Sequence, residues 1–353
     1  MWPNTKLTKL LNIQLPIIQA PMAGGPTTPE LVAAVSNAGG LGSLGAGYLD
    51  PEEIRKIIIK IKSLTDKPFA VNLFIPEPHH ATKQQMQLMI KTLKKLYPKF
   101  AREINPVFAP FVFPFAEQLQ VIIAEKVPVF SFTFGIPAAQ WIKKLKLAKI
   151  KLMGTATNLP EALALQKAGI DVIAAQGCEA GGHRGTFLGR AEEALIGSFA
   201  LIPQIADHTK VPIVASGGIM DARGILAALI LGATGVQMGT AFLACTESGA
   251  HAKFKKTILQ NKQDNTVLTR AYSGRLVRAI KNKFTTAMEA YQKQILDYPI
   301  QNSLTRSLRA AAAKKGLTDI MSMYSGQAAY LSQDLPAAEL LRRLDEGVKR
   351  LMR

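Results

Sequence analysis

Cysteine is scarce in this protein, and its scarcity narrows the functions to be considered. Only Cys178 and Cys245 occur among 353 residues. They are far apart and lack a CxxC or Cys/His spacing, so neither a disulfide framework nor a zinc site is expected. No HxxxH, HExxH or clustered acidic pattern occurs, which argues against a catalytic metal. The amino terminus also lacks the features of a secretory signal, so we expect a protein of the reducing cytoplasm.

Acidic residues are outnumbered by basic ones. The 43 Lys and Arg against 25 Asp and Glu give a formal net charge of +18 and a pI near 9.9. The basic residues lie in runs such as KIIIKIKSLTDK and KKLKLAKIK, where they alternate with apolar residues at helical spacing. Such runs are typical of solvated helix faces, and no aromatic stacking platform accompanies them, so nucleic acid is not the predicted partner. The positive excess favours a small anionic substrate.

Long uncharged segments are also rare. One stretch, residues 224–246, contains no charged residue and is long enough to reach across a bilayer. Gly232, Gly235 and Gly239 divide it, which predicts a helix followed by a short buried strand. We therefore expect no membrane span.

Short runs rich in β-branched residues recur along the sequence between amphipathic segments. This alternation is typical of repeated βα units around a parallel sheet. An open doubly wound sheet would alternate in the same way, but the count favours a (β/α)₈ TIM barrel. Eight strands are predicted, at residues 17–20, 42–45, 69–74, 127–132, 151–154, 171–175, 212–215 and 235–238.

Two parts of the sequence exceed a minimal barrel. Residues 76–110 follow the third strand and are predicted to hold an inserted helix, because Met86, Met89 and Leu93 recur at helical spacing. Residues 246–353 are predicted to form a helical lid and a carboxyl-terminal helix that packs on the barrel. The predicted division is thus a barrel at 1–245 and a lid region at 246–353.

Glycine-rich loops follow the last two predicted strands, as SGGI at 216–219 and QMGT at 237–240. Backbone N–H groups can approach an anion closely at glycine, and the loops after strands seven and eight are the usual phosphate site of these barrels. The alternative is that these glycines serve tight turns only. We predict a phosphate pocket at this rim.

Two amide side chains sit at other strand ends. A phosphate pocket alone would also suit a sugar-phosphate isomerase, so the rest of the ligand needs its own indication. Asn72 and Gln176 together offer donors and acceptors to the edge of a heteroaromatic ring such as the pyrimidine half of a flavin. Taken singly, each is more often an amide satisfied within the fold.

His183 is the most informative of the five histidines. It lies in the glycine-flanked loop GGHRG after the sixth strand, where it can face a ligand and act as a base near neutral pH. An anion-binding or packing histidine is the alternative. Arg184 is expected to pair with Glu179 or Glu192, and Cys178 to be a small buried residue. The other histidines are expected at the surface: His79, His80, His208 and His251.

The sequence resembles nitronate monooxygenases, formerly called 2-nitropropane dioxygenases, through QAPMAGG, FAVNLF, FSFTFGIP, AAQGCEAGGHRG, VASGGI, GVQMGT and AYSGR. The resemblance implies noncovalent FMN, a catalytic role for His183, and oxidation of alkyl nitronates, typified by propionate 3-nitronate, with O₂ to carbonyl compounds and nitrite. It places Met22 near the ring. The cofactor-binding positions that it implies are Asn72, Gln176, Gly181, Gly218, Gln237, Met238, Gly239 and Thr240.

Two other functions stay open at this point. An FMN- and NAD(P)H-dependent enoyl-acyl-carrier-protein reductase resembles the same barrel and the same loops, and a basic surface suits an acidic carrier protein. A noncatalytic flavin-binding protein is the second alternative. SFTFG and AYSGR favour the monooxygenase. A monomer and a homodimer are equally compatible with the sequence.

Overall fold

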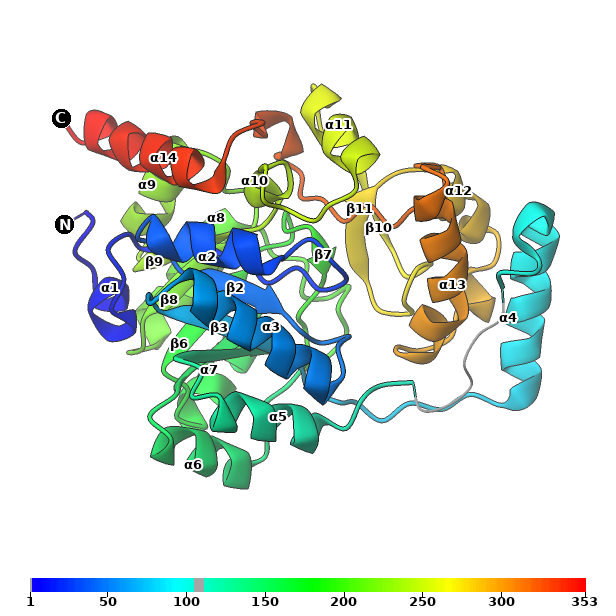
Figure 1. Cartoon of the computed structure of the whole chain (residues 1–353), viewed down its shortest axis with the longest axis horizontal. Coiled ribbons are helices and arrows are strands. Elements are labelled where there is room, and N and C mark those ends of the chain that lie inside the picture. Colours follow the sequence, from blue (N-terminus) through cyan, green and yellow to red (C-terminus); the bar gives the residue numbers. More distant parts are fainter. Residues whose placement is uncertain (1, 105–110) are drawn as a thin grey trace.

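The computed structural model describes residues 2–104 and 111–353 and contains a barrel of eight parallel strands (Figure 1). Residues 105–110 of the predicted insertion lie outside the described part. The strand order is β1-β9-β8-β6-β5-β4-β3-β2, which confirms the eight predicted strands to within two residues at each end. The barrel strands are β1 (Ile17–Gln19), β2 (Gly42–Gly45), β3 (Phe69–Phe74), β4 (Val129–Thr133), β5 (Lys151–Ala156), β6 (Val172–Gln176), β8 (Ile213–Ser216) and β9 (Gly235–Met238).

The barrel closes between β1 and β2 through one bridge, Ile18 to Leu41, and through the side chain of Gln19. The amide of Gln19 is fully buried; its Nε2 donates to the carbonyl of Ser43 at 3.2 Å, and its Oε1 accepts from the N–H of Ser43 at 3.0 Å. A side chain thus replaces backbone ladder bonds at the seam, where the strands are too short to supply them.

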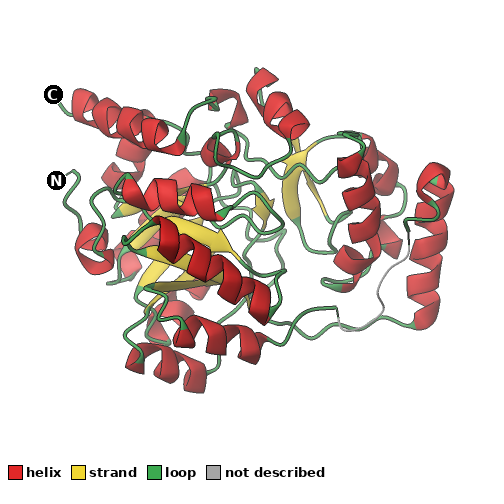
Figure 2. Cartoon of the chain, in the orientation of Figure 1, coloured by secondary structure: helices red, strands yellow, loops and turns green. Residues whose placement is uncertain are grey.

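Helices cover the outside of the barrel (Figure 2). Local signals start them: Thr28 caps α2 by accepting from the N–H of Leu31, and Asp50 forms a capping box with Glu53 at the start of α3. Figure 1 shows the helices around the sheet. The covering helices are α2 (Pro29–Asn37), α3 (Pro51–Leu64), α5 (Phe115–Ala124), α6 (Ala139–Leu147), α7 (Leu159–Lys167), α8 (Ser198–His208) and α9 (Ala222–Ile230).

The amino-terminal helix α1 (Lys6–Leu11) closes one end of the barrel. Its Leu7 and Leu11 join a buried cluster with inward-facing residues of the strands, among them Val129 and Val214. Burial of such side chains stabilises the fold by roughly 1.5–3 kcal/mol each. This end is therefore filled, and only the carboxyl ends of the strands are left to accommodate a ligand.

A second lobe stands beside the carboxyl ends of the strands (Figure 1). We define it as the inserted helix α4 together with the segment from β10 to α13. Met89 of α4 packs with Tyr272, Leu304 and Leu308 in one buried cluster, so the insertion shares a core with residues distant in the sequence. The elements here are α4 (Lys83–Leu96), η1 (Pro98–Phe100), β10 (Thr266–Thr269), β11 (Val277–Ile280), α12 (Lys283–Glu289), η2 (Gln292–Gln294) and α13 (Ile300–Lys314).

The region after residue 245 contains strands as well as the predicted helices. β10 and β11 form a hairpin, and β11 also pairs with the two-residue strand β7 (Gly182–His183) of the barrel loop. Between the lobe and the last helix lie α10 (Thr240–Leu243), α11 (Ala252–Gln260) and η3 (Ala329–Leu331). The division of the sequence at residue 246 stays a prediction.

The last helix, α14 (Ala337–Leu351), packs on the barrel. Its Leu340, Leu341 and Leu344 share a buried cluster with Ile225 of α9 and Leu31 of α2. The uncharged stretch 224–246 is divided among α9, β9 and α10. Across residues 2–104 and 111–353, no helix is both long and apolar enough to span a membrane.

Candidate functional site

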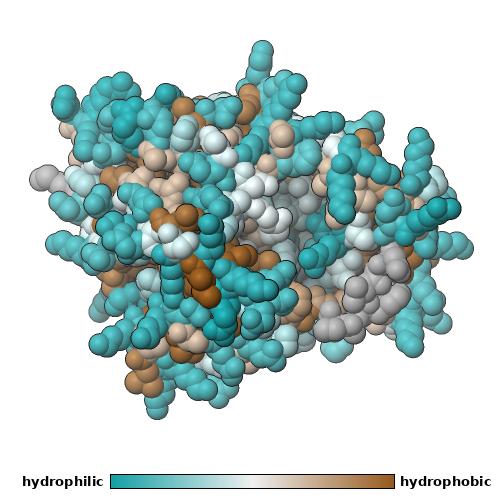
Figure 3. Space-filling model, in the orientation of Figure 1, coloured by the Kyte–Doolittle hydropathy of each residue, from teal (hydrophilic) through white to brown (hydrophobic). Residues whose placement is uncertain are grey.

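A cavity of about 800 Å³ opens at the carboxyl ends of the barrel strands. Its walls come from the barrel loops, from α13 of the second lobe and from the segment that follows α13. Figure 3 shows the surface hollowed between the two parts. The volume lies in the range of cofactor sites, and the position is where α/β barrels hold their active sites.

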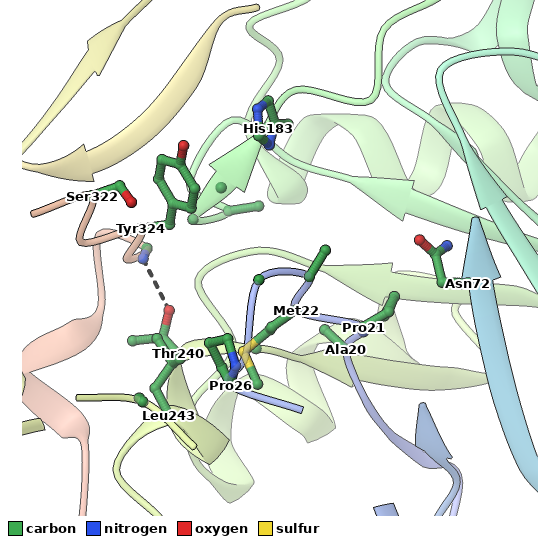
Figure 4. Close-up of a pocket in the computed structure, with 18 of the residues that line it drawn as sticks. Ala20, Pro21, Met22, Pro26, Asn72, His183, Thr240, Leu243, Ser322 and Tyr324 are labelled. Atoms are coloured by element: carbon green, nitrogen blue, oxygen red, sulfur yellow. Dashed lines mark hydrogen bonds between the residues drawn. The ribbon is translucent and has the colours of Figure 1, made fainter. Parts of the chain in front are cut away.

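His183 faces this cavity from β7 (Figure 4). Its strand position is set by pairing with Val277 of β11, and its Nε2 lies 2.9 Å from Oγ of Ser273. Aromatic rings surround the imidazole: Tyr324 at 5.4 Å and Phe134 at 5.8 Å between ring centroids. The imidazole is thus oriented by the hairpin of the second lobe, although it belongs to a barrel loop.

The environment keeps His183 uncharged. Burial lowers its pKa to about 3, and the positive charges of Arg275 and Arg309 act in the same direction. At neutral pH the imidazole is therefore uncharged, with a free lone pair on one ring nitrogen. Electrostatic attraction of an anion in this cavity comes from the arginines and not from an imidazolium ion.

The glycine loops lie where the sequence predicted. Gly217 and Gly218 have φ values of +113° and +72°, which non-glycine residues rarely adopt, so the loop after β8 needs both. Gly218, Gly239 and Thr240 line the cavity, and the Thr240 hydroxyl accepts a hydrogen bond of 2.9 Å from the N–H of Gly326 (Figure 4). These loops form a rim of small side chains and accessible backbone.

Gly181 closes the same rim against the carboxyl-terminal segment. A Cβ atom at this position would lie 2.5 Å from the backbone nitrogen of Gly326 and from the carbonyl carbon of Ser325. Two backbone segments therefore meet here without a side chain between them. Their close approach brings the rim residues of the barrel next to Tyr324 and the segment that follows it.

The two predicted amides, Asn72 and Gln176, both line the cavity. They differ in how many of their amide atoms already have a hydrogen-bond partner within the protein. Asn72 donates to the Ser131 hydroxyl at 3.0 Å, which leaves its carbonyl oxygen for a ligand. Gln176 donates to the backbone oxygen of His183 at 3.0 Å and accepts from the N–H of Gly185 at 2.8 Å. Gln176 therefore braces the loop that carries His183 as well as facing the cavity.

Met22 and Gln237 line the cavity, whereas Met238 does not. Successive side chains of a strand point to opposite faces, so Gln237 and Met238 of β9 cannot both face the ligand. Met238 is 1% exposed and packs in the core beside α9. Only its backbone takes part in this region, through a carbonyl that accepts from the N–H of Ala20 at 2.9 Å.

Arg184 has a different role from the one predicted. It is fully buried, and its guanidinium donates to the backbone oxygens of Gly177, Gln176 and Ala194 at 2.6–3.0 Å, with no direct bond to Glu179 or Glu192. Glu192 pairs with Arg270 instead. Arg184 therefore holds the loop before His183 in shape. Cys178 is half-buried and not fully buried.

Of the other histidines, His80, His208 and His251 are exposed as predicted, whereas His79 is half-buried. His251 also caps α11 and lines the cavity. His79 contacts the backbone of Glu77, and His208 contacts that of Gln204. In the described ranges, no group of three His, Cys, Asp or Glu residues is placed to hold a metal ion.

The sequence did not single out several residues that complete the site. Tyr48 follows β2 and Tyr324 follows α13, and both line the cavity; Tyr298 is hydrogen-bonded to Tyr48. Burial raises the pKa of all three phenols, so they are hydrogen-bond donors at neutral pH. The position of Tyr48 at a strand end was a usable signal. Arg306 and Arg309 of α13 also line the cavity. The sequence did not indicate this position, because the pattern of α13 is that of an amphipathic helix with its charged residues in solvent.

The fold and the site together define an α/β-barrel enzyme whose active-site cavity holds a neutral histidine opposite a glycine-lined rim. A family model described as nitronate monooxygenase matches residues 4–347. A probable nitronate monooxygenase of Staphylococcus haemolyticus strain JCSC1435 is 48% identical over 100% of this chain and 99% of the relative, and one of Staphylococcus aureus strain Newman is 45% identical with the same coverage. The chain belongs to the nitronate monooxygenase family, which is flavin-dependent.

Two solved structures are similar to this chain over almost its whole length. A nitroalkane oxidase from Streptomyces ansochromogenes superposes with a TM-score of 0.91 at 38% identity and covers 98% of each chain. FabK from Thermotoga maritima superposes with a TM-score of 0.78 at 30% identity, covering 99% of this chain and 97% of its own. The resemblance and the enzyme class predicted from the sequence are thus confirmed.

Proposed function

We propose that this protein binds FMN and oxidises alkyl nitronates with O₂ to carbonyl compounds and nitrite. The observation that carries the proposal is the placement of an uncharged His183 across a ligand-sized cavity from the glycine loops after β8 and β9. That arrangement supplies an anion cradle and a base in one enclosed space.

The residues present fit FMN. Gly218, Gly239 and Thr240 would hold the phosphate end, because their side chains are short or absent and they line the cavity. Gln237 lines the cavity beside them and would add a side-chain amide. Gly181 supports this rim through its contact with Gly326. Met22, Asn72 and Gln176 would lie near the isoalloxazine ring, with the Asn72 carbonyl as an acceptor.

His183 would take the α-proton of a neutral nitroalkane, or orient a nitronate that arrives already ionised. The Ser273 hydroxyl lies 2.9 Å from Nε2 of His183 and 3.3 Å from the carbonyl of Arg275. We propose that it donates to this carbonyl and accepts from Nε2–H of His183. This pattern leaves the lone pair on Nδ1, which we propose as the basic atom. The phenols of Tyr48 and Tyr324 are placed in the same cavity to donate hydrogen bonds to the nitro oxygens.

FMN, when bound, supplies the electron acceptor for the nitronate and is restored by O₂. The protein contributes positive charge near the cavity and limits the access of bulk water to it. Arg309 lies on one wall of the cavity, and Arg275 lies behind Phe134 with its guanidinium carbon 3.8 Å from the ring centroid. Arg309 favours an electron-rich anion, whereas the charge of Arg275 is paired with Glu77, and the second lobe limits contact with bulk water.

The proposal is tested by purification, an absorbance spectrum and an oxygen-electrode trace with propionate 3-nitronate, with nitrite measured at the end. We expect a yellow protein with one FMN per polypeptide and nitrite formed as O₂ is consumed. A colourless protein that refuses FMN would overturn the cofactor assignment. A yellow protein that is inert towards every nitronate tested would support a noncatalytic flavin-binding role.

The alternative of an NAD(P)H-dependent enoyl-acyl-carrier-protein reductase is favoured by one finding, the likeness to FabK from Thermotoga maritima. Anaerobic mixing separates the two functions. If NADH or NADPH bleaches the bound flavin rapidly and propionate 3-nitronate does not, the monooxygenase proposal is wrong. We expect the reverse result.

A further inference from the structure

The charged side chains that line the cavity all come from one helix. Among the described lining residues, Arg306 and Arg309 of α13 are the only ones with a permanent charge, and none is Asp, Glu or Lys. The cavity as a whole is therefore positively charged, and its positive charge is confined to the wall formed by the second lobe.

Arg309 is held rigidly by neutral partners. Its guanidinium donates to Oδ1 of Asn302 at 2.7 Å, to Oγ1 of Thr305 at 3.1 Å and to Oγ of Ser322 at 3.2 Å. No carboxylate lies within salt-bridge distance of it in the part of the protein that the structure describes. The side chain is thus positioned by four neutral oxygens, since it also donates to the backbone oxygen of Asn302 at 3.3 Å, and its charge is left uncompensated beside the cavity.

Arg306 lies one helical turn before Arg309, on the same face of α13. It is exposed and lines the cavity, and it too has no carboxylate partner within the described ranges. The exposed Arg342, by contrast, contacts both Glu339 and Glu346, whereas the exposed Arg102 and Arg350 have no such contact in the described ranges. An unpaired guanidinium beside a fixed one makes a two-pronged site that matches a carboxylate or a phosphate.

This pair is separate from the proposed phosphate cradle. Gly218, Gly239 and Thr240 belong to the barrel, whereas α13 belongs to the second lobe and faces the barrel across the cavity (Figure 1). Arg309 also acts electrostatically on His183 and Tyr324, which places it on the side of the cavity where the substrate would react.

We propose that Arg306 and Arg309 form a second anion subsite that binds the carboxylate tail of the substrate and so selects nitronates that carry a remote carboxylate over plain alkyl nitronates. The inference rests on the proposed function for the identity of the reacting group. The subsite itself requires only a ligand with two anionic ends, one facing His183 and one facing α13.

The kinetic test compares Arg306→Gln with the native enzyme on two substrates of equal carbon number, propionate 3-nitronate and propyl 1-nitronate. We expect kcat/KM to fall at least about tenfold for the carboxylated substrate, mainly through KM, and less than about twofold for the one without a carboxylate. Arg350→Gln, an exposed arginine of α14 outside the cavity, removes the same charge and is expected to change neither value. Equal losses on both substrates, or no loss on either, would overturn the subsite.

A binding test separates this proposal from the proposed function. Succinate has two anionic ends and carries no nitronate group to be oxidised, so its affinity for the FMN-loaded protein is measured by calorimetry beside that of acetate. We expect Arg306→Gln to weaken succinate at least about tenfold and acetate little. Arg309→Lys tests the second prong, with its melting temperature recorded because Arg309 also binds Asn302 and Thr305.

The outcomes are distinct. Weakened succinate binding without nitronate turnover in the native enzyme would retain the subsite and reject the proposed function. Loss of bound FMN in Arg306→Gln would instead assign the arginine to the cofactor phosphate, and slower flavin reduction by NADPH with unchanged succinate binding would assign it to a nucleotide. Either of these last two results would overturn the proposal.

Discussion

Val277 of β11 pairs with His183 of β7, so the candidate base of a barrel loop is held in a sheet by the second lobe. The same hairpin turn supplies Ser273, whose hydroxyl lies 2.9 Å from the imidazole. The barrel therefore does not complete its own active site. Catalytic geometry depends on the packing of α4 and α13 around the hairpin, which fixes where the second lobe stands.

Removal of the imidazole should separate cofactor binding from proton transfer. We expect His183→Ala to retain FMN but to lose at least ~10²-fold in kcat/KM with a neutral nitroalkane, the usual scale for loss of a general base. The loss with a preformed nitronate should be smaller, because no proton needs to be removed. The two rates are compared by oxygen consumption, and an unchanged rate with the nitroalkane would refute the assigned role.

Stability should depend on pH through His183. Its pKa is about 3 in the folded protein and near 6.5 when unfolded, so the unfolded state binds more protons between these values. The free energy of unfolding should therefore fall as the pH drops from 6.5 towards 3. Urea melts at pH 7 and pH 5 should show a smaller decrease for His183→Gln than for the native protein. The exposed His208→Gln is the control, and a decrease equal to that of the native protein in His183→Gln would count against the buried neutral form.

The contact of Gly181 with Ser325 and Gly326 should matter for the cofactor. Gly181→Ala places a Cβ atom 2.5 Å from backbone atoms that cannot move singly, so the rim must open. We expect FMN to bind at least about tenfold more weakly, as measured by fluorescence titration of the apoprotein, because the cradle loses its shape. Gly224→Ala is the matched control, because a Cβ there meets Ile219 at an ordinary 3.4 Å outside the proposed FMN contacts. Native-like affinity in Gly181→Ala would show that the rim is not part of the cradle.

The seam of the barrel should be its most sensitive polar contact. Gln19→Leu leaves the N–H and carbonyl of Ser43 buried without the Gln19 partners. Each of these two unsatisfied groups costs about 1–3 kcal/mol, so we expect a loss of about 2–6 kcal/mol in the free energy of unfolding. Equilibrium urea denaturation measures this. A loss below about 0.5 kcal/mol, the scale of an exposed substitution such as Gln292→Leu, would mean that the backbone alone closes the barrel.

The eight barrel strands could be predicted because each is marked by a hydrophobic run within its own few residues. Short, mainly apolar runs such as FAVNLF are typical of strands that are buried on both faces of a parallel sheet. The loops after those strands follow from the same count, so the positions of His183, Gly218 and Gly239 at one rim were predictable too. The motif did not show that the Met238 side chain faces the core, because a strand turns neighbouring residues to opposite faces; its place at the cofactor stays a prediction for its backbone.

The remaining features have no local signal. β7 is two residues long and exists as a strand only because β11 lies beside it. Arg184 was expected to pair with a carboxylate, but the folded loop offers it three carbonyl oxygens instead. Arg306 and Arg309 look like the solvated face of an amphipathic helix until α13 is placed over the cavity.

The repeated βα units, the glycine-lined rim and the loop histidine are already specified in the linear order of residues, since hydrophobic period and backbone freedom are properties of short segments. The neutral state of His183 and the positive charge that α13 brings to the cavity arise only when the two lobes pack together. Both depend on which distant groups surround a site, because desolvation and Coulomb interactions act through space and not along the polypeptide.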